Sequence, residues 1–226
     1  RIKSIDTSKA RDLPGVICVV TGHEFAETTG PTVTFASPPV VQHAIAVDKV
    51  RYVGEAVAAV VAESRYIAED ALELIEVEYE KLPVISDITQ QEFASGDAVL
   101  HPERGENNVA MDRTFTFGPV DDDFARADHV IKRRLRWGRS SAQPMETVGA
   151  VADFDAGTGK FNVHCNTSMY TYVGWLCAVS LNVPATHLNI IPTLAGGSFG
   201  SKLFLHRAIV LTAGLARIAG CPVKYM

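Results

Sequence analysis

Cysteine is scarce in this chain and nowhere closely paired. Only four occur among 226 residues, Cys18, Cys165, Cys177 and Cys221, and no C-x-x-C spacing joins any two of them. Zinc knuckles and iron–sulfur loops need closely spaced cysteines, so the sequence excludes both kinds of site. We expect four reduced thiols that behave as small buried hydrophobic residues.

Long apolar runs are also missing. Clean stretches such as residues 15–20 and 56–62 fall far short of the roughly 18 residues that a membrane-spanning helix requires. The first six residues contain neither an initiator methionine nor the apolar core of a signal peptide. We therefore expect a cytoplasmic protein without a membrane span. The abrupt first and last residues favour a fragment, or one piece of a larger subunit.

An excess of positive charge is absent as well. The chain holds 21 Lys and Arg against 26 Asp and Glu, a formal net charge of −5. Proteins that bind nucleic acid or anionic membranes recruit a basic face for phosphate, so both partner classes are disfavoured. With 47% hydrophobic and 21% charged residues, the composition is typical of a globular protein long enough to bury a sizeable core.

Residues 1–88 alternate the patterns of strands and helices. The apolar runs 16–20 and 56–62 predict buried strands. Ser64 is a suitable N-cap for a helix over residues 65–75, whose apolar side chains recur at helical spacing. The alternating charges of residues 76–80 predict a strand at a sheet edge. The pattern indicates a mixed α/β unit.

Residues 89–118 lose this periodicity and gather turn-forming residues, so we expect a long surface connection and a domain boundary there. Beyond it the expected elements are a short acidic helix, a strand, a β-hairpin and a second helix, over residues 119–127, 130–137, 147–154 with 160–167, and 169–181. The chain ends on residues 221–226, which resemble the start of a further strand.

The most informative segment joins a predicted strand, residues 187–194, to a predicted helix, residues 203–219. It reads Leu-Ala-Gly-Gly-Ser-Phe-Gly-Ser-Lys from Leu194 to Lys202. A glycine loop before a helix lets backbone N–H groups approach an anion or a metal-oxo group closely. Neither the phosphate-binding P-loop nor the dinucleotide fingerprint fits these residues. A pure packing role for the glycines stays open, while Phe199 between them is expected to close over a pocket or the core.

This loop, residues 196–202, resembles the Gly-Gly-Gly-Phe-Gly-Gly-Lys loop of the molybdenum hydroxylases, the family of xanthine dehydrogenase, aldehyde oxidase and aerobic carbon monoxide dehydrogenase. Residues 51–60, Arg-Tyr-Val-Gly-Glu-Ala-Val-Ala-Ala-Val, are similar to that family's first-domain signature, and residues 68–83 continue it. Pro144, Met145 and Glu146, with residues 149–152, are similar to the opening of its molybdenum-binding part. The resemblance covers nearly the whole chain, in the family's order.

The resemblance implies an α+β fold of mixed α/β type. An aldehyde oxidase-type a/b hammerhead domain, truncated at its N-terminus, would occupy residues 1–88, a linker 89–118, and the first part of the molybdopterin-binding domain 119–226. It also implies an oxidoreductase that hydroxylates an aldehyde, an N-heterocycle or a similar small organic substrate. The implied cofactor is molybdopterin carrying molybdenum, in its cytosine dinucleotide form, with the metal held by the pterin dithiolene. 2Fe–2S clusters and FAD would lie on partner domains or subunits.

Carried onto this chain, the resemblance implies a set of cofactor-contacting loop residues, namely Gly196, Gly197, Ser198, Phe199 and Gly200. Ser198 and Ser201 replace family glycines, so the backbone of this loop can adopt fewer conformations than the family's. Leu203 stands where purine-oxidising members carry a substrate-binding glutamate. That departure disfavours xanthine and favours an apolar or aromatic portion of substrate, or one with no purine edge to read.

Two further positions are implied near the substrate pocket. A family glutamine close to the metal is replaced by Gly138 or Ser140, depending on the alignment of the strand. Gln143 is near in sequence, and it either faces the pocket or is a solvated strand-end residue. The general-base glutamate is expected beyond Met226, so no catalytic residue is assigned in this chain.

Two functional hypotheses follow. The first is a cofactor-binding enzyme component that works with the rest of its subunit and with iron–sulfur and flavin partners. The second is a non-catalytic scaffold or subunit-docking module. The remaining conspicuous residues are expected to be structural: isolated His164, His187 and His206, a solvated basic run at 132–136, and Tyr170, Tyr172 and Trp175 in the core or an interface.

Overall fold

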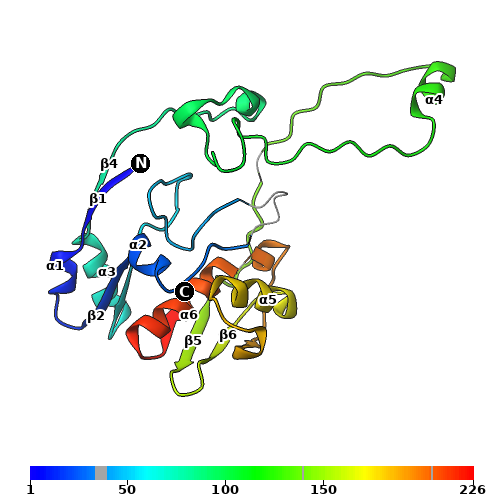
Figure 1. Cartoon of the computed structure of the whole chain (residues 1–226). Coiled ribbons are helices and arrows are strands. Elements are labelled where there is room, and N and C mark those ends of the chain that lie inside the picture. Colours follow the sequence, from blue (N-terminus) through cyan, green and yellow to red (C-terminus); the bar gives the residue numbers. More distant parts are fainter. Residues whose placement is uncertain (34–39, 139, 205) are drawn as a thin grey trace.

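The computed structural model describes residues 1–33, 40–138, 140–204 and 206–226. Within these residues the strands form two antiparallel pairs, β1–β4 and β2–β3, and a four-stranded sheet in the order β7-β6-β5-β8 (Figure 1). The mixed helix and strand content and the order of the two units confirm the predicted α+β fold class.

The first unit follows the sequence pattern closely. Its elements are β1 (Ile2–Asp6), α1 (Ser8–Arg11), β2 (Val16–Thr21), α2 (Gly22–Ala26), β3 (Ala58–Ala62), α3 (Arg65–Glu73) and β4 (Glu76–Tyr79). Ser64 caps α3 as predicted, because its side chain accepts the Ile67 N–H at 3.3 Å. Helix α3 ends two residues before the expected position 75, and among the described residues β4 pairs with β1 alone, as a charged edge strand should.

The second unit is built on one hairpin and one crossover. Its elements are β5 (Ala150–Asp155), β6 (Lys160–Cys165), α5 (Tyr170–Ser180), β7 (Leu188–Pro192), α6 (His206–Ala219) and β8 (Val223–Tyr225). Strands β5 and β6 are antiparallel with Asp155 opposite Lys160, which confirms the predicted hairpin. Strand β7 runs parallel to β6, and α5 makes the crossover between them. Helix α6 packs on β5 and against α5.

Both units contribute to one buried cluster. Val20, Phe25 and Ile45 of the first unit belong to the same core as Phe161 and Ile209 of the second. Backbone bonds reinforce this contact, since the Gly30 N–H donates to the Ser180 carbonyl at 2.7 Å. The Arg217 guanidinium donates to the carbonyl oxygens of Thr28 and Leu181, which lie on opposite sides of the junction. The two units therefore pack against each other and are not joined by a flexible linker alone.

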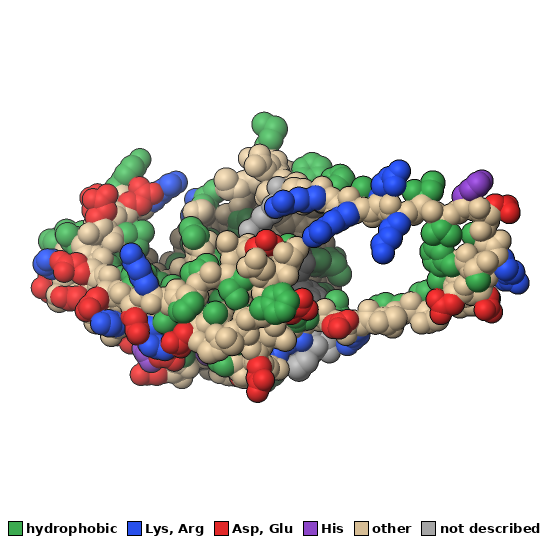
Figure 2. Space-filling view, turned by 90° about the horizontal axis from the view of Figure 1, so that it is seen from above, with side chains coloured by type: hydrophobic (Ala, Val, Ile, Leu, Met, Phe, Trp, Pro, Cys, Tyr) green, Lys and Arg blue, Asp and Glu red, His purple; other side chains and the backbone are tan. Residues whose placement is uncertain are grey.

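The connection after β4 lies on the surface, as predicted, and holds two short 3₁₀ turns, Ile88–Phe93 and Gly96–Ala98. Residues 109–138 then leave the body as an extended arm and return to it, with α4 (Val120–Arg126) at the tip (Figure 1). Every residue of the arm is exposed. Figure 2 shows hydrophobic and basic side chains standing out along it.

The strand expected over residues 130–137 is wrong. These residues are extended but form no ladder, because no other segment in the described part of the chain lies beside them to pair with. Large apolar side chains along the arm stay in the open, namely Met111, Phe115, Phe117, Phe124, Ile131, Leu135 and Trp137. The predicted basic run on the same leg is exposed.

The cysteine prediction holds in part. All four thiols are free, and Cys165 and Cys177 are buried, but Cys18 and Cys221 are only partly covered. Burial raises the pKa of the Cys165 and Cys177 thiols, so these two side chains are neutral and unreactive at physiological pH.

Candidate functional site: the glycine loop

The glycine loop links the end of β7 to helix α6. It passes through left-handed backbone conformations at Gly197 (φ +92°), Phe199 (φ +48°) and Gly200 (φ +88°). Glycine adopts such angles freely, whereas Phe199 does so at a steric cost. A 3₁₀ turn, Ser201–Phe204, precedes α6, so the helix starts at His206 and not at Leu203 as predicted, and residue 205 lies outside the described residues.

The two serines that replace family glycines hold the turn together. The Ser198 carbonyl accepts the Ser201 N–H at 3.0 Å and the Ser201 hydroxyl at 2.7 Å. The Ser198 hydroxyl accepts the Lys202 N–H at 3.3 Å and contacts the Ser168 hydroxyl at 3.4 Å. The serines thus replace conformational freedom with local hydrogen bonds.

The carboxylate of Glu146, which lies outside the loop, binds both ends of the loop. Glu146 Oε2 accepts the Gly196 N–H at 2.7 Å and also a hydrogen bond from the Lys202 ammonium. The Lys202 side chain has no exposed surface. The hydrogen bond from Lys202, joined by the one from Gly196, holds the pKa of Glu146 below its usual value. The two residues belong to separate sequence motifs. The sequence alone does not predict their pairing, because they are 56 positions apart.

The end of strand β6 fixes the segment that carries this carboxylate. The Asn166 side chain donates to the Thr147 carbonyl at 2.8 Å and accepts the Gly149 N–H at 3.2 Å. The Thr167 hydroxyl donates to the Lys202 carbonyl at 3.0 Å. Adjacent residues of one strand end therefore hold both partners of the ion pair in place.

The structure corrects one expectation about the loop. The Phe199 side chain is 79% exposed, so among the described residues it covers neither a pocket nor the core. Its ring lies beside Gly197, where a Cβ would stand 3.2 Å from Phe199 Cε2 and 3.4 Å from Pro144 Cβ. The reason is the loop's position at the surface, where no described segment passes over it.

The other predicted pocket residues are only partly brought together. Leu203 lies half-buried in the 3₁₀ turn, directly after Lys202. Ser140 and Gln143 are exposed on the segment that leads to Glu146, and no hydrogen bond among the described residues ties either to the loop. Gly138 is likewise exposed.

Four loop N–H groups are left unpaired. In the described part of the chain, the N–H groups of Gly197, Ser198, Phe199 and Gly200 donate to no protein acceptor, while those on either side are bonded. Successive N–H groups around left-handed residues form a concavity that suits anionic oxygen atoms. A Cβ at Gly200 would meet nothing within 4 Å, so no described atom crowds the loop at that residue. Free backbone donors of this kind suit the anionic groups of a molybdopterin cofactor, the one that the sequence resemblance implies.

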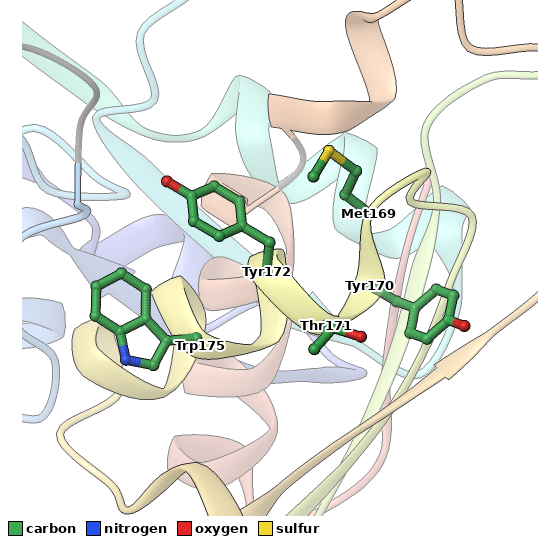
Figure 3. A pocket seen from close by; sticks show the side chains of 5 residues that line it. All are labelled: Met169, Tyr170, Thr171, Tyr172 and Trp175. Atoms are coloured by element: carbon green, nitrogen blue, oxygen red, sulfur yellow. The ribbon is translucent and has the colours of Figure 1, made fainter.

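An open hollow lies on α5 close to the loop (Figure 3). Met169, Tyr170, Thr171, Tyr172 and Trp175 line it, and Ser168, which contacts Ser198, directly precedes it. The Tyr172 and Trp175 rings stack with centroids 6.3 Å apart, while Tyr170 points the other way (Figure 3). All three aromatic side chains are exposed, so the core option for them is wrong within this chain and the interface option stays a prediction.

The histidines take unrelated structural places. His206 is buried, His187 contacts the Gly159 carbonyl at 3.2 Å, and His164 is exposed. The described residues contain no group of three His, Cys, Asp or Glu side chains that could hold a metal ion. Across the same residues, the helices are too short or too polar to cross a membrane.

Comparisons with known proteins agree with this geometry. Residues 100–226 match the family described as molybdopterin cofactor-binding domain, and residues 1–83 match the aldehyde oxidase and xanthine dehydrogenase a/b hammerhead domain. The chain is 35% identical to the 6-hydroxypseudooxynicotine dehydrogenase complex subunit gamma of Paenarthrobacter nicotinovorans and 30% identical to the carbon monoxide dehydrogenase large chain of Afipia carboxidovorans. In each case the match covers 100% of this chain and 29% of the relative.

A solved structure gives the same result. Quinoline 2-oxidoreductase from Pseudomonas putida 86 superposes with a TM-score of 0.89 at 34% identity, over 100% of this chain and 29% of that one. The chain thus spans less than a third of the length of the relatives it matches.

Proposed function

The chain belongs to the aldehyde oxidase and xanthine dehydrogenase family of molybdopterin-binding oxidoreductases, and on that premise we propose that it is the cofactor-binding part of a large catalytic subunit. The enzyme hydroxylates a small organic substrate in the cytoplasm. Electrons pass to 2Fe–2S clusters and FAD on partner domains or subunits. Residues 1–88 form the hammerhead domain, 89–118 the linker and 119–226 the first part of the molybdopterin-binding domain.

The observation that carries this proposal is the row of free N–H groups from Gly197 to Gly200. When molybdopterin in its cytosine dinucleotide form is bound, these groups would donate to its anionic oxygen atoms and so hold it. When bound, the cofactor supplies the two-electron redox chemistry. The chain's own residues would hold it: the free N–H groups would bind it, the serines keep the loop in shape, and the exposed Phe199 ring is available to contact it. The general base is a glutamate outside this chain.

An N-heterocycle is the substrate class that we rank first. Leu203 presents an apolar side chain directly after the loop, in place of a carboxylate that could read a purine edge. Two matched proteins are named for quinoline and 6-hydroxypseudooxynicotine. Gln143 and Ser140, both exposed on the neighbouring segment, form the rim of the substrate pocket with the rest of the subunit.

The exposed arm supports the partner assignment. Its large apolar side chains stand exposed one after another, and exposed apolar surface of this kind marks interaction sites. The matched relatives are more than three times as long as the matched segment. The remainder of the molybdopterin subunit covers the arm, and iron–sulfur and flavin subunits complete the assembly.

Metal and flavin analysis of the native assembly, purified through this chain, tests the proposal. We expect about one molybdenum per chain together with iron and flavin, followed by turnover of N-heterocycles in preference to xanthine. A folded, fully assembled complex without molybdenum would overturn the enzyme assignment. It would leave the scaffold or subunit-docking function and reduce the glycine loop to a packing device.

A further inference from the structure

The Lys202 side chain is fully buried at the end of the glycine loop. In the described part of the chain its ammonium has one partner, Glu146 Oε2. A buried charge is tolerated only when it is paired, so the position of Lys202 depends on that carboxylate. Glu146 itself is about one third exposed, with 37% of its side-chain surface open, and water can solvate it without Lys202.

Glu146 also fits against the other end of the loop. Its Oε2 accepts the Gly196 N–H at 2.7 Å, and a Cβ at Gly196 would stand 2.8 Å from Glu146 Cβ. Glycine at 196 is therefore required for this contact. One carboxylate oxygen thus binds the first residue of the loop through its backbone and the last through its side chain.

We propose that Glu146 and Lys202 are positioning residues that clamp both ends of the loop, so that the N–H groups of residues 197–200 stay free and fixed in place. The inference deepens the proposed function, because it assumes that this loop holds the cofactor. The two residues act through the backbone between them. Removing the clamp lets the two ends of the loop move relative to each other, and the N–H groups lose their fixed positions.

The clamp stands apart from the forces that fold the chain. The large hydrophobic cluster is built from apolar residues of both units, whereas Glu146 and Lys202 are joined by polar contacts at the glycine loop. The segment that carries Glu146 has no helix or strand of its own and is fixed by hydrogen bonds to Asn166. Loss of the clamp should therefore change the loop more than the fold.

Exposure predicts an asymmetry between the two single variants. Glu146→Gln leaves the buried ammonium of Lys202 without a counter-charge, whereas Lys202→Met leaves a carboxylate that water can reach. Glu146→Gln is therefore the more destabilising change. The double variant Glu146→Gln with Lys202→Met removes both charges and recovers most of the thermal stability. A positioning role requires that this double variant still lacks the loop geometry at the Lys202 end, because an amide at position 146 can still accept the Gly196 N–H.

The test uses the full-length holoenzyme, its two single variants and the double variant, with Lys9→Met as control because Lys9 forms an exposed ion pair with Glu76. Hydrogen exchange of the 194–204 peptide is measured with and without cofactor, alongside molybdenum content and the Mo(V) EPR signal. In the double variant we expect exchange to be faster by about tenfold, with an altered EPR signal and a melting temperature near wild type. The control should change none of these.

Wild-type exchange and an unchanged EPR signal in the double variant would overturn the clamp, even if molybdenum is bound. If the fully assembled wild-type protein contains no molybdenum, the proposed function is overturned instead. In that case hydrogen exchange alone decides the clamp, since it reports on the loop backbone whether or not a cofactor is present.

Discussion

Gly214 of helix α6 lies so close to the ring of Phe25 that a Cβ at this glycine would stand 2.5 Å from Phe25 Cζ. Phe25 belongs to α2 of the first unit and is fully buried. Thr29 Cγ2 would lie 3.3 Å from the same Cβ. The absence of a side chain on one helix is thus what lets the two units share a core.

Gly214→Ala should push helix α6 and the Phe25 ring apart. The added methyl forces the Phe25 ring or helix α6 to move, and we expect a loss of about 1–3 kcal/mol in the free energy of unfolding, less the small helix-propensity gain of alanine. Urea denaturation measures it. Gly105→Ala is the control, since a Cβ there meets nothing within 4 Å. Equal stability of the two variants would show that the interface is loosely packed.

Phe199→Ala should abolish turnover of the assembled enzyme and leave the fold intact. The ring is exposed, so its loss removes little packing, and the free energy of unfolding should change by less than about 0.5 kcal/mol. Steady-state turnover and thermal unfolding of the same preparation decide it. Retained turnover would contradict the role of the loop at the cofactor.

Arg207 should couple helix α6 to the first unit. Its guanidinium donates to the Tyr52 hydroxyl and lies 5.4 Å from that ring's centroid. It also lies 3.9 Å from Glu55 Oε1, on a side chain that is only 1% exposed. Arg207→Met should cost about 1–3 kcal/mol, because it leaves a buried carboxylate with less compensation.

A double-mutant cycle with Glu55→Gln checks this assignment. The second substitution removes the carboxylate's charge, so the two effects should be less than additive. Full additivity would place the cost of Arg207→Met in the lost contact with Tyr52 alone.

Acid should weaken the fold through His206. Burial, with a smaller contribution from the Arg207 charge, lowers the pKa of the His206 imidazole below its usual value. As the pH falls through about 6.5, the unfolded chain takes up a proton that the folded chain resists, so the free energy of unfolding decreases. It stops decreasing below the lowered folded pKa.

Urea denaturation at several pH values between 7.5 and 5.5 measures this slope. His206→Gln should reduce it and not abolish it, because burial also lowers the pKa of His43. An unchanged slope would show that His206 is hydrated or protonated in the folded chain.

Local patterns were sufficient to predict most of the fold. The apolar run behind β2, the Ser64 cap of α3 and the turn between β5 and β6 depend on neighbouring residues, and all three are confirmed. The strand over residues 130–137 failed for the opposite reason. Its local sequence is compatible with an extended strand, but a strand also needs a partner, and a single run of sequence does not contain one.

The site shows the same limit. The loop and its glycines were visible because they are contiguous, whereas the pairing of Glu146 with Lys202 depends on two motifs that only the fold brings together. The exposure of Phe199 could not be read from its aromatic character. The burial of a side chain depends on which other segments pack over it, and the sequence of the loop does not specify those segments.

The exposed tryptophan on the arm allows partner binding to be followed by intrinsic fluorescence. The chain has two tryptophans, and both Trp137 on the arm and Trp175 on α5 are exposed, at 91% and 53%. Indole emission shifts to shorter wavelength when water is excluded from the ring. Any partner that covers these two surfaces will therefore report its arrival as a blue shift in intrinsic fluorescence, and the Trp137→Phe variant will show how much of that shift comes from the arm.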